Sequence, residues 1–335
     1  MSNNLSLSEQ QSIFRQEQTS GQARPARQAR KKTPVVPATL FEIQQGFVLG
    51  ARLARSGHKV GRLCVRELEP GVVVPSAGRT NIEKPEKIEQ ALHAVAETIG
   101  NGTGPVGLLV PDGIVRVSIL EFENLPADSK EQEALIRWKM KPALPFPPEE
   151  ARLSYEISLQ EPKRTEVLVA AVRNAVLAEY EALIEKLNGD VRLVLPATAA
   201  LLPLLSADSG QGELLLHATT GGLAAAVVQG QRLRLWRSQQ ISWVSQEDWL
   251  QKAAQEASRM LASAQDHLQL EIGRISLCTR PVESPNLAAE LAQGISQPVE
   301  TLGASWQFAE KLSAPEELLF ENFGAALAGL LANTV

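Results

Sequence analysis

The sequence predicts an α/β protein with two lobes that share one order of elements, three strands, a helix and a strand, and with a β-α-β-β-α subdomain inserted in the first lobe. Three observations support this fold class. The same succession of strand and helix patterns begins twice, near residues 40 and 213. A chain of 335 residues exceeds one ordinary core and fits two domains. Its 44% hydrophobic and 21% charged residues are typical of a globular protein.

Three short strands separated by glycine-bearing turns open the first copy; their sequences are TLFEI, FVLGARLA and VGRLCVREL. A helix follows, because four aliphatic residues repeat at spacings of four, three and four: Ile88, Leu92, Val95 and Ile99. Pro85 suits its first turn and Gly100 its end. The run VGLLV, residues 106–110, then predicts a buried strand.

The second copy repeats this succession from Glu213, with the strands ELLLHA, LAAAVVQ and RLRLWRS. The helix after them begins with Ser245 and Asp248 at the spacing of a capping box. Its apolar residues fall on one side: Trp249, Leu250, Ala253, Ala257, Met260, Leu261, Ala264 and Leu268. GRISLC is the strand that follows. The two copies have negligible sequence identity, so they match in the order of their elements only.

The insert lies between the two copies. Its first strand, GIVRVSILEF, leads to a helix that Asp128 and Glu131 start as a capping box. PALPFPPEE ends this helix, because Pro142 lacks an amide hydrogen and restricts the residue before it. RLSYEISL and TEVLVAAVR are two more strands. A second helix from residue 174 turns five apolar residues inward and stops at Gly189: Leu177, Tyr180, Leu183, Ile184 and Leu187.

The predicted organisation has four parts: a disordered basic tail over residues 1–38, a first lobe over 39–110 and about 190–208, the inserted subdomain over 111–189, and a second lobe over 212–335. The tail holds six bases and two acids, a net charge of +4, and little to bury. Its bases allow loose attachment to an anionic membrane surface. A solvated leader with no such role is the other interpretation.

Composition and spacing exclude several classes of protein. The chain has no apolar run long enough to cross a bilayer and no secretory signal, so we expect a cytoplasmic location. Two cysteines give neither a disulfide framework nor a metal site. The total charge of −5 leaves −9 outside the tail, which argues against nucleic-acid binding. The four histidines form no catalytic triad pattern and no set of metal ligands.

Two βββαβ lobes facing a cleft, with an insert in the first, describe the actin-like (ribonuclease H-like) architecture. The run LLVPDGIVRVSILEFENLPADSKEQEALIRWKMKPALPFPPEEARLSYEI, followed by EVLVAAVRNAVLAEYEALIEKLNG, resembles the PilM family of actin-like proteins of type IV pilus assembly. The resemblance is strong over roughly residues 105–205 and loose over 40–335, and the block Ile136–Pro148 is its most specific part. The related cytoplasmic domain of type II secretion L-type proteins has the same fold.

The resemblance implies a scaffold at the cytoplasmic face of the inner membrane, peripherally associated with it. Such a protein captures the N-terminal cytoplasmic segment of a PilN-like single-span partner in a groove between the first lobe and the insert. It also links that complex to the pilus motor and alignment complex. The residues that the resemblance places at this groove are Trp138, Pro145, Phe146 and Pro147. Core packing of Trp138 with Leu135 on an apolar helix face is the competing interpretation.

In this fold, one β-hairpin of each lobe presents an acid and a glycine to a nucleotide, and a later glycine pair accommodates the base. Glycine lets the backbone approach a phosphate, and a carboxylate is a natural ligand for Mg²⁺. The first hairpin here keeps Glu42 but has Gln44 in the glycine position. In the second, His217 replaces the acid and Thr219 the glycine, while Thr220, Gly221 and Gly222 remain. Thr279 and Arg280 stand where the glycine pair belongs.

Each lost charge-handling group in a catalytic site typically costs about 3 kcal/mol of transition-state stabilisation. We therefore expect no catalytic residues, no resident cofactor and no metal. Glu42 and the segment Thr219–Gly222 are a vestigial nucleotide site in this interpretation, that of a pseudo-ATPase scaffold. The alternative is an actin-like pilus assembly protein that still binds or hydrolyses Mg-ATP. A sugar kinase ranks below both, because neither hairpin holds an aspartate.

Overall fold

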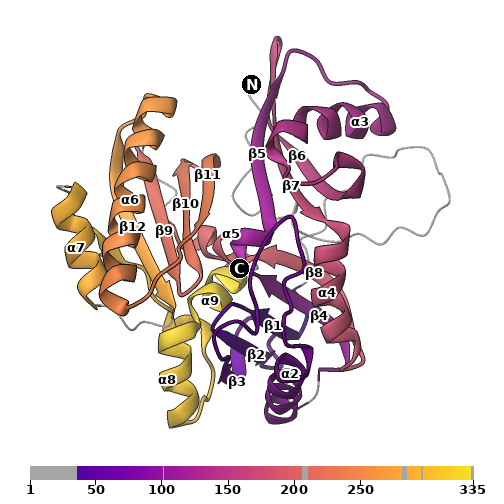
Figure 1. Cartoon of the computed structure of the whole chain (residues 1–335), viewed down its shortest axis with the longest axis vertical. Helices are drawn as coiled ribbons and strands as arrows, with labels where there is room; N and C mark the ends of the chain where they lie inside the picture. The colour runs from indigo at the N-terminus through magenta and orange to yellow at the C-terminus, as the bar shows by residue number, and fades with distance from the viewer. Residues whose placement is uncertain (1–35, 101, 206–209, 281–284, 296, 333–335) are drawn as a thin grey trace.

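The computed structural model describes residues 36–100, 102–205, 210–280, 285–295 and 297–332. Within these ranges the chain forms two five-stranded sheets, one three-stranded sheet and the helices that pack on them. Figure 1 shows the two larger sheets in two neighbouring lobes, with the three-stranded sheet beside the lobe that contains β1. The predicted tail lies outside the described residues up to residue 35. Val36, which the tail boundary included, is buried in the first core.

The first sheet contains five strands in the order β3-β2-β1-β4-β8: β1 (Thr39–Ile43), β2 (Phe47–Leu53), β3 (Val60–Glu67), β4 (Gly104–Val110) and β8 (Gly189–Pro196). Every residue of β1 is buried, as expected of a central strand. Helix α2 (Pro85–Ile99) packs on β2 and β3. Its predicted ends are confirmed, since Pro85 is its first residue and Gly100 caps it at a φ of 88°.

The second sheet has the order β11-β10-β9-β12-β13: β9 (Gly212–Thr219), β10 (Gly222–Gln229), β11 (Arg232–Gln240), β12 (Ile272–Arg280) and β13 (Glu300–Thr301). Helix α6 (Gln246–Leu268) packs on it, and α7 (Pro285–Ile295) packs on α6. The predicted cap of α6 is confirmed by the Ser245 hydroxyl, which accepts a hydrogen bond from the Asp248 amide at 3.2 Å.

Numbered within each lobe, both sheets have the strand order 3-2-1-4-5. In each, the first strand runs antiparallel to the second and parallel to the fourth. The prediction of two lobes with the same order of elements is therefore confirmed. It follows that the two hairpin turns, β1–β2 and β9–β10, occupy equivalent places in the two lobes.

The insert begins with β5 (Val115–Phe122). It also contains α3 (Ser129–Met140), β6 (Ala151–Glu161) and β7 (Arg164–Arg173), and its sheet has the order β5-β7-β6. The Asp128 carboxylate caps α3 by accepting from the amides of Lys130 and Glu131, both at 3.0 Å. Ile136 and Met140 of α3 pack on the insert sheet, where β7 supplies most of the buried residues.

Helix α4 (Asn174–Glu185) follows β7 and packs against β8, with its apolar face in the core of the first lobe. It ends before the predicted stop: Asn188 takes the left-handed conformation at a φ of 59°, and Gly189 begins β8. The segment with its own core around the third sheet therefore ends with β7. The domain boundaries proposed from the sequence stay predictions.

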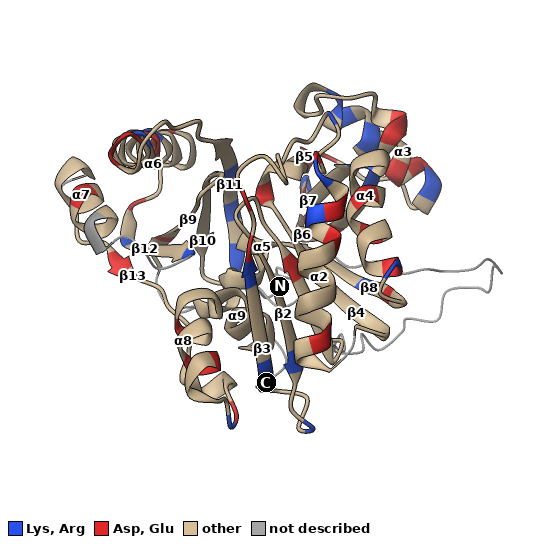
Figure 2. Cartoon of the chain, turned by 60° about the horizontal axis from the view of Figure 1, so that its bottom comes forward, with Lys and Arg blue, Asp and Glu red and all other residues tan. Residues whose placement is uncertain are grey.

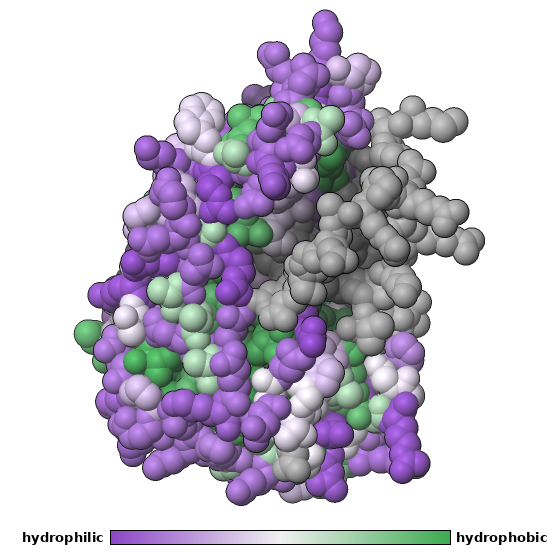
Figure 3. All heavy atoms as spheres, turned by 90° about the vertical axis from the view of Figure 1, so that its right-hand side faces the viewer, coloured by the Kyte–Doolittle hydropathy of each residue, from purple (hydrophilic) through white to green (hydrophobic). Residues whose placement is uncertain are grey.

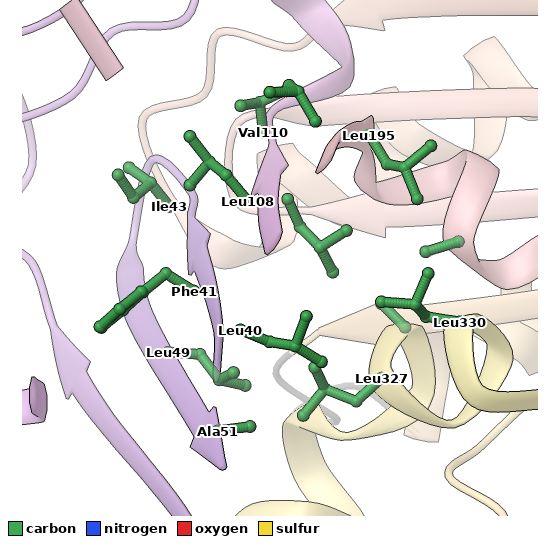
Figure 4. Packing of buried hydrophobic residues seen from close by; sticks show 14 of the residues in the cluster. Leu40, Phe41, Ile43, Leu49, Ala51, Leu108, Val110, Leu195, Leu327 and Leu330 are labelled. Carbon is green, nitrogen blue, oxygen red and sulfur yellow. The ribbon is translucent and has the colours of Figure 1, made fainter. Parts of the chain in front are cut away.

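The C-terminal helices return to the first lobe. Helix α8 (Ala314–Phe323) packs on β3, and α9 (Ala325–Ala332) packs on the short helix α5 (Ala197–Leu201). Figure 4 shows Leu327 and Leu330 of α9 among the buried residues of β1, β2, β4 and β8. The same core cluster includes Leu215, Val228 and Trp236 of the second sheet. The two lobes thus share one continuous apolar base.

The surface is mainly polar on the face that Figure 3 shows. Most of the described area of this face is hydrophilic, with small hydrophobic patches. Among the helices of the described ranges, none combines the length and the apolar character that crossing a bilayer requires.

Candidate functional site

Two hairpin turns, one from each lobe, touch each other at the cleft. The β1–β2 turn contributes Gln45 and Gly46, and the β9–β10 turn contributes Thr220 and Gly221. A Cβ atom on Gly46 would lie 2.9 Å from Thr220 Oγ1, closer than real Cβ atoms approach their neighbours. A Cβ atom on Gly221 would collide with the side-chain oxygen of Gln45. The absence of side chains at these two glycines therefore lets the turns approach each other.

A fully buried ion pair crosses the cleft from β1 to β12. Arg280 Nη1 donates to Glu42 Oε2 at 2.7 Å. Gln44 Nε2 donates to the other carboxylate oxygen, Glu42 Oε1, at 2.8 Å. Both oxygens of the carboxylate therefore have partners, which is the condition under which a buried carboxylate is tolerated. Because Glu42 belongs to the first sheet and Arg280 to the second, the pair connects the two lobes.

His217 extends this network on β9. Its Nε2 accepts a hydrogen bond from Arg280 Nε at 3.1 Å. Its Nδ1 lies 2.7 Å from Thr198 Oγ1 and 3.2 Å from Asp112 Oδ2. Arginine has only donors, so Nε2 must be the accepting nitrogen, and the ring proton is on Nδ1. The neutral imidazole then donates across the cleft to the first lobe. His217 is a wholly buried residue of strand β9.

Asp112 and Thr198 complete the network from the first lobe. Asp112 follows β4 in the short 3-10 helix η2 (Asp112–Ile114). The Thr198 amide donates to Asp112 Oδ1 at 3.0 Å, and the Thr198 hydroxyl donates to Oδ2 at 2.7 Å. Neither residue was predicted from the sequence to belong to the site. A usable signal was the segment Pro111–Gly113 directly after a buried parallel strand, since ligand sites of α/β sheets lie beyond the carboxyl ends of the strands.

The electrostatics of the network follow from its burial. Burial and the neighbouring Arg280 guanidinium lower the pKa of His217, against the opposing effect of Asp112 and Glu42, so the imidazole is held neutral. For Arg280, burial alone would lower the pKa, but Glu42 and the other nearby acids raise it, so the guanidinium stays charged. Burial raises the pKa of the adjacent Cys278 thiol to about 12, which keeps it protonated. Arg280 is thus the positive charge that faces the two carboxylates.

The space left between the turns is small. A cavity of about 30 Å³ lies there, and its lining includes Gln44, Asp112, His217, Thr219, Gly221 and Gly222. Sites for small organic ligands typically measure about 300–1,000 Å³. A volume of this size holds about one water molecule.

The structure brings most of the predicted nucleotide-site residues to this cavity. Thr219, Gly221 and Gly222 line it, while Glu42 is paired with Arg280 and Gln44. The Thr220 carbonyl accepts a hydrogen bond from Trp243 Nε1 at 2.8 Å. Their assignment as a vestigial nucleotide site stays a prediction. Among the described residues, no group of three or more His, Cys, Asp or Glu side chains is placed to hold a metal ion.

The predicted partner-binding residues differ in exposure. Trp138 on α3 is 70% exposed, so the interpretation that it belongs to an apolar core face is wrong. Phe146 is buried in a small cluster with Ala77 and Ala151, at the contact between the insert and the loop after β3. Pro145 and Pro147 on either side of it are exposed. Trp138 and the two prolines are therefore accessible to a partner, whereas the buried side chain of Phe146 packs between the insert and the loop after β3.

A second and larger cavity, of about 320 Å³, lies between the insert and the second lobe. Strands β5 and β11, each at the edge of its own sheet, form two of its walls, and α6 forms a third. Its basic residues are Arg116 and Arg237; Figure 2 shows basic residues along β11. Burial lowers the pKa of Arg116. This cavity, the groove between β5 and β11, was not predicted from the sequence, because it depends on two strands more than 100 residues apart in the chain.

No protein-family model matches the sequence, and no curated protein matches it. Solved structures do. A PilM-PilN type IV pilus biogenesis complex is similar at 16% identity and a TM-score of 0.73, over 89% of this chain and 98% of that chain. A Bacteroides thetaiotaomicron protein with an actin-like ATPase fold and unknown function gives 10% identity and a TM-score of 0.52, over 88% and 94%. The cytoplasmic domain of EpsL, an inner membrane component of the Vibrio cholerae type II secretion system, gives 12% and 0.44, over 76% and 93%.

The first two likenesses establish the fold. The chain has the actin-like α/β fold, in the PilM-like form with an insert in the first lobe. The fold class predicted from the sequence is confirmed.

Proposed function

We propose that this chain is a scaffold of type IV pilus assembly. It binds the N-terminal cytoplasmic segment of a PilN-like single-span partner and works by recognition rather than by catalysis. The observation that carries the proposal is the likeness to a PilM-PilN complex over nearly the whole of both chains. In this proposal the protein lies at the cytoplasmic face of the inner membrane, associates peripherally with it, and connects its partner to the pilus motor and alignment complex.

The chemistry of the cleft supports a role without nucleotide. Arg280 and His217 occupy the space between the two hairpins with their own side chains, and the turns contact each other directly. The remaining cavity of about 30 Å³ is too small for a triphosphate. Neither hairpin offers a free carboxylate to Mg²⁺, because Glu42 is already paired. ATP and Mg²⁺ are therefore not expected as cofactors.

The alternative, an ATP-binding or ATP-hydrolysing protein of the same fold, is favoured only by Thr219, Gly221 and Gly222 at the cavity. Thermal melting with and without Mg-ATP separates the two. A ligand at 100 times its Kd raises the free energy of unfolding by about 2.7 kcal/mol, a readily measured shift. We expect an unchanged melting temperature at millimolar Mg-ATP, and a clear increase would favour the alternative.

The proposed partner surface combines exposed Trp138 with the prolines of the following loop. Aromatic side chains such as Trp are frequent anchors of protein interfaces. Arg137 holds this loop in place by donating to the carbonyls of Pro148 and Ala151, at 2.6 and 2.7 Å. The loop is thus presented in one conformation, which lowers the entropy cost of binding.

A synthetic peptide that copies the partner's cytoplasmic segment tests the proposal by titration with fluorescence anisotropy. We expect saturable binding to the full chain, weakened at least tenfold by Trp138→Ala. Binding should be unchanged by Trp306→Ala, which removes an exposed tryptophan outside the insert, in the 3-10 helix η6 (Trp306–Phe308). Hydrogen exchange then locates the peptide: protection at residues 134–147 supports the insert surface, and protection at 115–117 and 236–239 places the peptide in the second groove. Absence of binding at several hundred micromolar would refute the proposed function.

A further inference from the structure

Five hydrogen-bonding side chains connect the two lobes across the cleft. Arg280 of the second lobe reaches Glu42 of the first at 2.7 Å. His217 of the second lobe reaches Thr198 at 2.7 Å and Asp112 at 3.2 Å, both in the first lobe. Within the second lobe, Arg280 Nε fixes the tautomer of His217 that makes the cross-cleft contact possible. The two ties therefore depend on a single guanidinium.

The charges explain why this group is a cation. Glu42 and Asp112 are two carboxylates on the first lobe, and His217 is held neutral. Both acids interact electrostatically with Arg280, whose positive charge offsets the repulsion between two nearby carboxylates. Its guanidinium donates to an acid with one nitrogen and to the imidazole with another, a geometry that lysine cannot reproduce.

We infer that Arg280 is a built-in cation of the cleft, which holds the two lobes closed without any nucleotide or metal ion. This device is separate from partner binding and goes beyond the proposed function. Direct contact between Gly46 and Thr220 closes the same cleft at its turns. Because the lobes share an apolar base, loss of the cation opens the cleft by pivoting about that base rather than by separating the lobes.

Double electron-electron resonance, which measures the distance between two spin labels, tests the inference with one label on each lobe. Ser56→Cys in the turn after β2 and Gln255→Cys on α6 place labels at exposed positions on opposite lobes, and the two native cysteines are buried. We expect one narrow distance in the otherwise unchanged protein, with or without Mg-ATP. Arg280→Ala is expected to add a population at longer distance. Added guanidinium ion at millimolar concentration should restore the narrow distance, and urea at the same concentration should not.

Two further variants keep the test decisive. Arg259→Ala on α6 removes a guanidinium that is 72% exposed and is expected to leave the distance unchanged. Glu42→Gln keeps the size of the side chain but removes the charge that Arg280 meets, so it should open the cleft as Arg280→Ala does and serves where that variant does not fold. Folded Arg280→Ala or Glu42→Gln protein with the narrow distance of the parent would overturn the inference. So would longer distances that guanidinium fails to reverse in Arg280→Ala.

Discussion

Replacing Arg280 with methionine should destabilise the protein more than any single change at its surface. The Arg280 guanidinium and the Glu42 carboxylate are both fully buried. Removing one partner of a buried pair costs about 3–5 kcal/mol, because the other charge is left uncompensated. The lost hydrogen bond to His217 adds about 1 kcal/mol. We therefore expect Arg280→Met to lower the free energy of unfolding by about 4–6 kcal/mol.

The double variant separates this explanation from simple loss of packing. Glu42→Leu alone should also cost about 3–5 kcal/mol, since it leaves the guanidinium buried without its acid. Glu42→Leu combined with Arg280→Met removes both charges, so its cost should be several kcal/mol below the sum of the single costs. Urea denaturation followed by circular dichroism measures all three, with Arg259→Met as an exposed control. Single costs below about 1 kcal/mol, or costs that simply add, would refute the reasoning.

Three other predictions use the same protein. The pKa of His217 is lowered in the folded state, so the unfolded chain binds the proton more readily, and the stability from this residue is present above about pH 6.5 and lost as the pH falls below it. The urea midpoint of His217→Asn should therefore fall less between pH 7 and pH 5 than that of the parent protein. Equal slopes for the two proteins would contradict this. Gly46→Ala should lower the free energy of unfolding, measured by urea denaturation, by about 1–3 kcal/mol through its clash with Thr220 Oγ1, and Thr220→Ala in the same chain should recover part of that cost. If the costs of the two substitutions simply added, the turns would not touch. Trp138→Ala should change the free energy of unfolding by less than about 0.5 kcal/mol, whereas Phe146→Ala should cost about 3 kcal/mol, and similar values for both would place Trp138 in a core.

The sequence was sufficient for most of the fold, because the two lobes are built from local signals. Glycine turns separate the strands of each hairpin, and apolar residues repeat with helical periodicity in α2 and α6. The packing partners of two helices were not predictable in this way. Helix α4 has a clear apolar face, but periodicity does not show which sheet that face meets. Helix α9 is buried on all sides, so its sequence has no amphipathic pattern that would indicate a packing face. Its return to the first lobe is evident only from the three-dimensional structure.

Several residues of the site were predictable from the sequence, but the contacts between them were not. Sequence comparison with the pattern of the fold marked Gln44, His217 and Arg280 as unusual residues, each interpreted as a separate loss of nucleotide chemistry. Their contacts were out of reach, because Arg280 and Glu42 are 238 residues apart in the chain. Asp112 and Thr198 carry no motif of their own, and their role appears only when β4 and α5 come together beside β9.

The residues of the cleft network depend on one another. If Arg280 alone were replaced by glycine, Glu42 would remain buried without a positive charge, at a cost of several kcal/mol. If His217 alone were an aspartate, it would lie beside Asp112 as a second anion, and Arg280 would lose the His217 nitrogen to which it donates. The residues at these positions are therefore interdependent, as expected of a buried polar network. We therefore expect a single change, Arg280→Gly or His217→Asp, to destabilise the fold rather than to create a nucleotide site.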